Sequence, residues 1–166
     1  MDQGLLLARL VIGLLMAANG TQRLFGWFGG YGLDGTGGFF ETLGFRPGRF
    51  FAATASLGEL AGGILVAAGF LGPIGPALML AVMIVAAVSV HWSHGVFAAN
   101  NGIEVPLLYA TGAVTLALTG FGRFSLDALL GLTALWTPLI TWSILAIAVI
   151  GAAANLAIRR RAPATA

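Results

Sequence analysis

The chain has 166 residues, of which 58% are hydrophobic and 8% are charged, and its mean hydropathy is +0.95. A soluble domain has about 25% charged residues, so this composition excludes a water-soluble protein and indicates an integral membrane protein. The formal net charge is +2, and all eight basic residues are arginines. The absence of lysine excludes a Walker-type phosphate loop and a lysine Schiff base. The arginines form no single basic stripe, so no nucleic-acid surface is indicated.

Apolar runs predict five membrane-spanning helices, since about 20 apolar residues are needed to cross a bilayer. These runs lie at 5–26, 50–71, 73–93, 104–121 and 136–158. Short connections between the second, third and fourth runs favour antiparallel neighbours. We therefore predict an all-α membrane protein, with an antiparallel four-helix transmembrane bundle and a fifth, C-terminal transmembrane helix.

We expect a four-helix module over residues 1–130, an additional transmembrane helix over 131–158 and a basic cytoplasmic tail over 159–166. The module contains one long connection, 27–49, which is rich in glycine and aromatic residues.

Two shorter segments are typical of helices that lie in the membrane interface. In the connection 27–49, Thr36 is expected to cap a short helix that ends at Gly44. In the segment 124–135, Ser125 is the expected N-cap.

Arginines also predict the orientation, because cytoplasmic loops carry an excess of basic residues. Six of the arginines lie close to span ends, at positions 23, 46, 49, 159, 160 and 161. Five crossings place all of them on one side, whereas four crossings would divide them equally. We therefore expect a multi-pass protein of the cell inner (plasma) membrane, with its N-terminus outside and its C-terminus in the cytoplasm.

Glu59 lies well inside the second apolar run. A carboxylate at this depth costs several kcal/mol unless it is ion-paired or protonated, so we interpret it as functional, with a purely structural role as the alternative. At about 1.5 Å per residue, Glu59 lies about 13 Å from the cytoplasmic end of its helix, and Asn19 lies about 10 Å from that end. Asn19 and Arg23 share one helical face, because they are four residues apart.

These depths predict a polar pocket in the cytoplasmic half of the bundle. Glu59 and His91 are its candidate catalytic residues, and its other expected members are Asn19, Gln22, Arg23, Tyr109 and Glu104.

His91, His94 and Glu104 could together bind a metal ion. An HxxH pair at a membrane boundary is more often a solvated helix end, so the prediction is no metal site. Proton exchange by histidine is the other interpretation. The absence of cysteine excludes cysteine-ligated clusters and haem attached through a Cys-x-x-Cys-His motif. No flavin motif is present in the sequence. Gly58 and Gly62 form a G-x-x-x-G pair, which is typical of close helix packing.

Several stretches together resemble one family. They are NGTQRLFG at 19–26, ETLGFRP at 41–47, GELAGGILVAAG at 58–69, HWSHGVF at 91–97, NGIE at 101–104 and TGFGRFSLD at 119–127. The chain is similar to the DoxX family of small bacterial membrane proteins over about residues 5–130, which implies a four-helix module. Motif positions that the resemblance marks as structural are Gly58, Gly62, Gly63, Gly120, Gly122, Arg123, Ser125 and Asp127.

The resemblance implies a link to thiosulfate:quinone oxidoreductase and quinol-oxidising systems, or a role as a membrane partner of soluble redox and sulfur-transfer proteins. Two positions depart from the family pattern. Asn19 replaces the usual histidine. Arg23 replaces the usual lysine; the arginine keeps the positive charge but cannot deprotonate.

Three hypotheses follow. In the first, the chain is a membrane subunit of a redox system that contacts quinone and a partner oxidoreductase. In the second, it is a non-catalytic scaffold in the lipid bilayer that recruits a soluble redox or sulfur-transfer protein. In the third, it transports a small molecule or protons, although no inverted repeat supports this. An oligomer is compatible with all three.

Overall fold

The computed structural model describes residues 1–160, and in this range every regular element is helical. The long helices are α1 (Asp2–Phe25), α3 (Gly48–Ala68), α4 (Ile74–Ala86), α5 (Glu104–Thr119) and α7 (Pro138–Ala157). Two short helices are α2 (Gly32–Thr42) and α6 (Leu126–Leu129). Of the predicted basic tail, residues 161–166 lie outside the described part.

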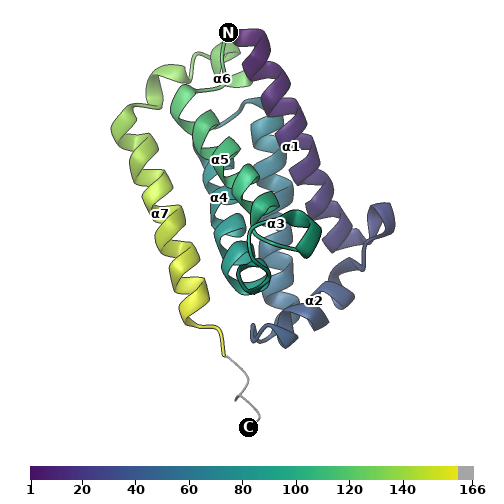
Figure 1. Ribbon diagram of the computed structural model, residues 1–166. Coiled ribbons are helices and arrows are strands. Elements are labelled where there is room, and N and C mark those ends of the chain that lie inside the picture. Colours follow the sequence, from purple (N-terminus) through teal and green to yellow (C-terminus); the bar gives the residue numbers. More distant parts are fainter. Residues whose placement is uncertain (161–166) are drawn as a thin grey trace.

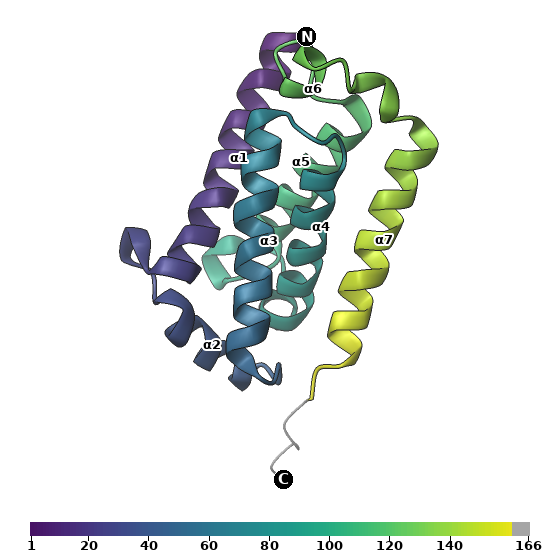
Figure 2. The ribbon, with the colours of Figure 1, turned by 180° about the vertical axis from the view of Figure 1, so that it is seen from behind.

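The long helices extend between two ends of the molecule (Figures 1 and 2). The N-terminus and α6 lie at one end, which we call the α6 end, and α2 lies at the opposite end, which we call the α2 end (Figure 1). Helix α1 packs against α3, α3 against α4, and α4 against both α5 and α7. The core therefore lies around α4 and the inner faces of α1, α3 and α5.

Four segments are long and apolar enough to cross a membrane. They are Asp2–Phe25, Gly48–Ala68, Ile74–His94 and Pro138–Ala157. These confirm the prediction of an all-helical, membrane-type chain. The fourth predicted span is a shorter apolar helix, Glu104–Thr119, of 16 residues.

Glycines bring α1 and α3 into backbone contact. A Cβ atom added at Gly13 would lie 2.5 Å from the Ala67 nitrogen, and one added at Gly63 would lie 2.4 Å from the Ala17 nitrogen. Neither position has room for a side chain, so the two helices pack more closely than larger residues allow. Gly62 faces α4 instead, where its Cβ would lie 3.0 Å from the Gly75 carbonyl oxygen.

The third apolar segment is not α-helical along its whole length. After α4 it continues as a π-helical turn, Ala87–His91, and a 3-10 turn, Trp92–His94. The Ser89 hydroxyl donates to the Val85 carbonyl oxygen, and His94 Nδ1 lies 2.9 Å from the Val90 carbonyl oxygen. These side chains bind carbonyl groups of the turn that precedes them.

The expectation that Thr36 caps a helix is wrong. Helix α2 begins at Gly32, and Thr36 lies inside it, where its hydroxyl donates to the Arg23 carbonyl oxygen at 3.4 Å. The physical reason is tertiary contact. A Cβ at Gly37 would lie 3.0 Å from the Arg49 Cα, so α2 rests closely on the start of α3, and this packing outweighs the low helix propensity of its glycines.

Candidate functional site

Arg23 and Glu59 form an ion pair inside the bundle. Arg23 lies in the last turn of α1 and Glu59 in the middle of α3, and Arg23 Nη1 lies 2.9 Å from Glu59 Oε1. The Glu59 side chain is 0% exposed and that of Arg23 is 35% exposed. The close approach of α1 and α3 at their glycines brings these two side chains within reach of each other. Arg23 thus supplies the compensating charge that a buried carboxylate requires.

Other polar groups surround this ion pair. Ser56 lies three residues before Glu59 on α3 and is also 0% exposed. Within residues 1–160, the Ser56 hydroxyl and Glu59 Oε2 have no hydrogen-bond partner. The Tyr109 hydroxyl interacts with the Asn19 side chain and lies within electrostatic reach of Glu59. Four predicted pocket residues, Asn19, Arg23, Glu59 and Tyr109, are therefore neighbours.

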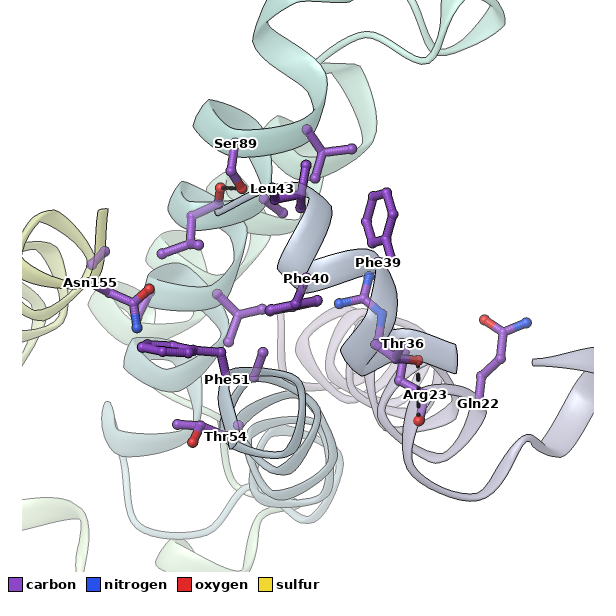
Figure 3. A pocket seen from close by; sticks show the side chains of 18 of the residues that line it. Gln22, Arg23, Thr36, Phe39, Phe40, Leu43, Phe51, Thr54, Ser89 and Asn155 are labelled. Carbon is purple, nitrogen blue, oxygen red and sulfur yellow. Dashed lines mark hydrogen bonds between the residues drawn. The ribbon is translucent and has the colours of Figure 1, made fainter. Parts of the chain in front are cut away.

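A cavity of about 770 Å³ lies next to this group, between α2, α3, α4 and α7. Most of its wall is apolar, and it includes Phe39, Phe40 and Phe51 (Figure 3). The polar side chains along it are Gln22, Arg23, Tyr31, Thr36, Thr54, Ser89, His91 and Asn155. Asn155, on α7, lies on the opposite side of Phe40 from Arg23 (Figure 3). The cavity thus has polar side chains at several separated places on a largely apolar wall.

The predicted pocket is divided in the structure. Gln22, Arg23 and His91 line the cavity. Glu59 is fully buried behind Arg23 and does not line it.

Asn19 and Tyr109 also lie outside the cavity wall. The Tyr109 hydroxyl lies beside the Asn19 side chain instead. The depth of a residue along its helix predicted the level of the site, but not which side of each helix faces the open space.

Glu104 does not belong to the cavity. Its Oε2 accepts a hydrogen bond of 2.7 Å from the Ala98 backbone nitrogen, so it closes the loop between α4 and α5. The same loop positions His91, whose Nδ1 lies 2.7 Å from the Asn101 carbonyl oxygen. Because a carbonyl oxygen only accepts, Nδ1 is the donor, and Nε2 is left as the basic atom of the neutral ring.

A family model described as DoxX matches residues 4–92, which is more than half of the chain. The chain belongs to the DoxX family. The matched part of this DoxX protein contains both members of the Arg23–Glu59 ion pair and His91. The stretch 93–130, to which the sequence resemblance also extends, lies beyond the matched residues. No curated protein and no solved structure matches the chain.

The alternative metal site in this DoxX protein would need His91, His94 and Glu104 together. Their polar atoms instead contact the backbone of Asn101, Val90 and Ala98, respectively. In residues 1–160, no three His, Asp or Glu side chains form a group that could hold a metal ion.

At the α6 end, the segment 119–127 joins several elements of the DoxX protein. Asp127 is 2% exposed and accepts three hydrogen bonds, from the Leu71 nitrogen at 2.9 Å, the Gly72 nitrogen at 2.7 Å and Trp136 Nε1 at 2.9 Å. It therefore links the turn between α3 and α4 to the chain that leads into α7. Ser125 caps α6 as predicted, since its hydroxyl accepts from the Ala128 nitrogen at 3.2 Å.

The two glycines of this segment shape its backbone. Gly120 and Gly122 have φ angles of 74° and 73°, which favour glycine. The backbone nitrogen of Arg123 donates to Asp2 Oδ1 at 3.0 Å, which ties the segment to the start of α1. The contacts of this segment are made with other parts of the scaffold, far from the cavity at the α2 end.

Sequence reasoning assigned no site role to several polar residues that the structure buries or places at the cavity. Arg9 is 3% exposed, and its Nη2 donates to the Phe124 carbonyl oxygen. A single arginine inside an apolar run was the available signal for it. Ser56, Ser89 and Asn155 gave no comparable signal, because small polar residues are common in membrane helices.

Proposed function

We propose that this DoxX protein is a membrane subunit of a redox system and binds a quinone head group in the cavity at the α2 end. One observation carries the proposal. A guanidinium at the wall of a largely apolar cavity is held in place by a fully buried carboxylate. Pockets for small organic ligands share this design, with apolar walls and a few fixed polar groups.

The chemistry assigns a separate role to each residue. A quinone carbonyl accepts hydrogen bonds, and Arg23 offers several N–H donors in a fixed plane. Glu59 acts as a positioning residue, because it contacts the cavity only through Arg23. His91 can take up a proton on Nε2, because its Nδ1 is bound to the Asn101 carbonyl oxygen. A bound quinone would accept electrons, which on this proposal come from a partner oxidoreductase.

The proposal includes five crossings of the plasma membrane, with α5 as the fourth. Helix α5 is an apolar helix of 16 residues, shorter than the four candidate spans. Arg46, Arg49, Arg159 and Arg160 then lie on the cytoplasmic side, which supports an external N-terminus.

A scaffold function has one specific observation in its favour. Large aromatic side chains are exposed in the connection after α1, with Trp27 57%, Phe28 74% and Tyr31 88% exposed. Such residues suit a membrane interface, and they also suit the docking of a redox or sulfur-transfer protein. On this hypothesis the ion pair serves packing alone.

The deciding experiment is to purify the full chain in mild detergent and to quantify quinone in a solvent extract. Wild type is compared with Arg23→Gln and with Arg123→Gln, a matched charge change at the α6 end. We expect near-stoichiometric quinone in wild type and in Arg123→Gln, and at least a tenfold loss in folded Arg23→Gln. Trace quinone in all three proteins would reject the quinone site and leave the scaffold function as the better explanation.

A further inference from the structure

The end of α7 is joined to the turn between α2 and α3. The Arg160 backbone nitrogen donates to the Gly44 carbonyl oxygen at 2.9 Å. Gly44 has a φ angle of +94°, and a Cβ there would lie 3.3 Å from the Cγ atom of Arg159. The aliphatic part of Arg159 therefore lies against Gly44, and Arg46 follows two residues later in the same turn. Figure 1 shows the end of α7 and α2 at the same end of the molecule.

This junction gathers positive charge that the neighbouring acids do not neutralise. We call Arg46, Arg159 and Arg160 the basic turn; within residues 1–160 none of them forms an ion pair. The nearby carboxylates are already engaged. Asp34 pairs with Arg49 at 3.3 Å, and Glu41 Oε1 accepts from the Gly48 nitrogen at 3.1 Å.

The apolar cavity reaches the basic turn from the inside of the molecule. Leu43 lines the cavity and directly precedes Gly44, and Asn155 lines it one helical turn before Arg159. Phe51 also lines the cavity, beside Asn155 (Figure 3). An amphiphile can therefore place an apolar chain against this wall while its charged head contacts the arginines.

We propose that the basic turn binds the phosphate of an anionic phospholipid, with one acyl chain against Leu43 and Phe51. Basic residues at the ends of membrane helices attract anionic lipids. Arginine in particular binds phosphate oxygens through two parallel N–H groups. The apolar wall beside the charges selects a lipid over an acidic protein segment. The site lies at the α7 side of the cavity, away from Arg23, and it does not depend on quinone binding.

The test uses the full chain in mild detergent and native mass spectrometry. Phosphatidylglycerol and phosphatidylcholine with identical acyl chains are titrated against three proteins. These are wild type, the control Arg123→Gln, and a triple variant that combines Arg46→Gln, Arg159→Gln and Arg160→Gln. We expect wild type and the control to prefer phosphatidylglycerol by at least tenfold. The triple variant should lose this preference, because each arginine near the surface contributes about fivefold. If the triple variant does not fold, Arg46→Gln alone should show the fivefold loss.

Three results would overturn the proposal. They are equal binding of the two lipids by wild type, an unchanged preference in the variants of the basic turn, and an equal loss in Arg123→Gln. Displacement of phosphatidylglycerol by millimolar inorganic phosphate would assign the site to free phosphate instead. Quinone is quantified in the same preparations. Loss of lipid preference with quinone retained supports the proposal and shows that the two sites are independent.

Discussion

The Arg23 guanidinium lies between Glu59 and the cavity, so the carboxylate that the sequence marks as functional reaches the open space only through its ion partner. The two members of the pair differ in exposure, since Glu59 is fully buried and Arg23 is 35% exposed. This asymmetry decides which member is more costly to remove.

We expect Arg23→Gln to destabilise the protein more than Glu59→Gln. Removing the arginine leaves a buried carboxylate without its partner, which costs about 3–5 kcal/mol. Removing the carboxylate leaves a guanidinium that can still reach the cavity and polar surroundings. Thermal unfolding in detergent measures both effects. The double variant should recover part of the loss, and strictly additive effects would show that the two residues do not interact.

The glycine contact between α1 and α3 gives a second prediction. Gly63→Ala should lower the free energy of unfolding by about 1–3 kcal/mol, because its new Cβ would overlap the α1 backbone. Gly4→Ala is the matched control, since nothing lies within 4 Å of a Cβ there. We expect the control to be neutral or slightly stabilising, because alanine favours helix. An equal response of the two variants would contradict the close packing.

Asp127→Asn should destabilise the α6 end by about 1–3 kcal/mol, because an amide cannot accept all three of the hydrogen bonds that the carboxylate accepts. Trp136 fluorescence should change as well, since its indole nitrogen loses a charged acceptor. Asp34→Asn serves as the control. Its carboxylate is 83% exposed and forms a surface ion pair, so its loss should cost less than about 1 kcal/mol. Unchanged stability and fluorescence in Asp127→Asn would contradict the linking role.

Filling the cavity tests the quinone proposal without altering any charge. Ala55 lines the cavity on α3, whereas Ala61 on the same helix is exposed. We expect Ala55→Leu to reduce co-purified quinone at least tenfold, because the larger side chain occupies space that the head group needs. Ala61→Leu should retain the wild-type quinone content. A similar quinone content in both variants would place the quinone elsewhere.

Local patterns in the sequence predicted those parts of the molecule that depend on local chemistry. Apolar runs located the long helices, and Ser125 was identified as a cap from its position before α6. Depth along the helices predicted a similar level for Asn19 and Glu59, and helical spacing put Arg23 on the same face as Asn19; the structure places the three residues as neighbours.

Features that depend on contacts between distant segments could not be predicted in this way. Thr36 has the chemistry of a cap, but the packing of α2 on α3 moves the helix start to Gly32. Glu104 has the charge of a site residue, but a loop nitrogen six residues earlier binds it. Asn155 joins the cavity only because α7 packs against α4, which no local pattern in either helix specifies.

Because His91 ends the π-helical turn Ala87–His91, the direction of its side chain depends on the number of residues in that turn. Such a turn arises where one extra residue is accommodated within an α-helix. Successive residues of an α-helix are rotated by about 100°, so deletion of one residue between Ala87 and Ser89 would restore regular winding and turn His91 away from the cavity. Amino-acid identity alone therefore does not preserve this histidine's place at the cavity. The length of the segment before it must be preserved as well.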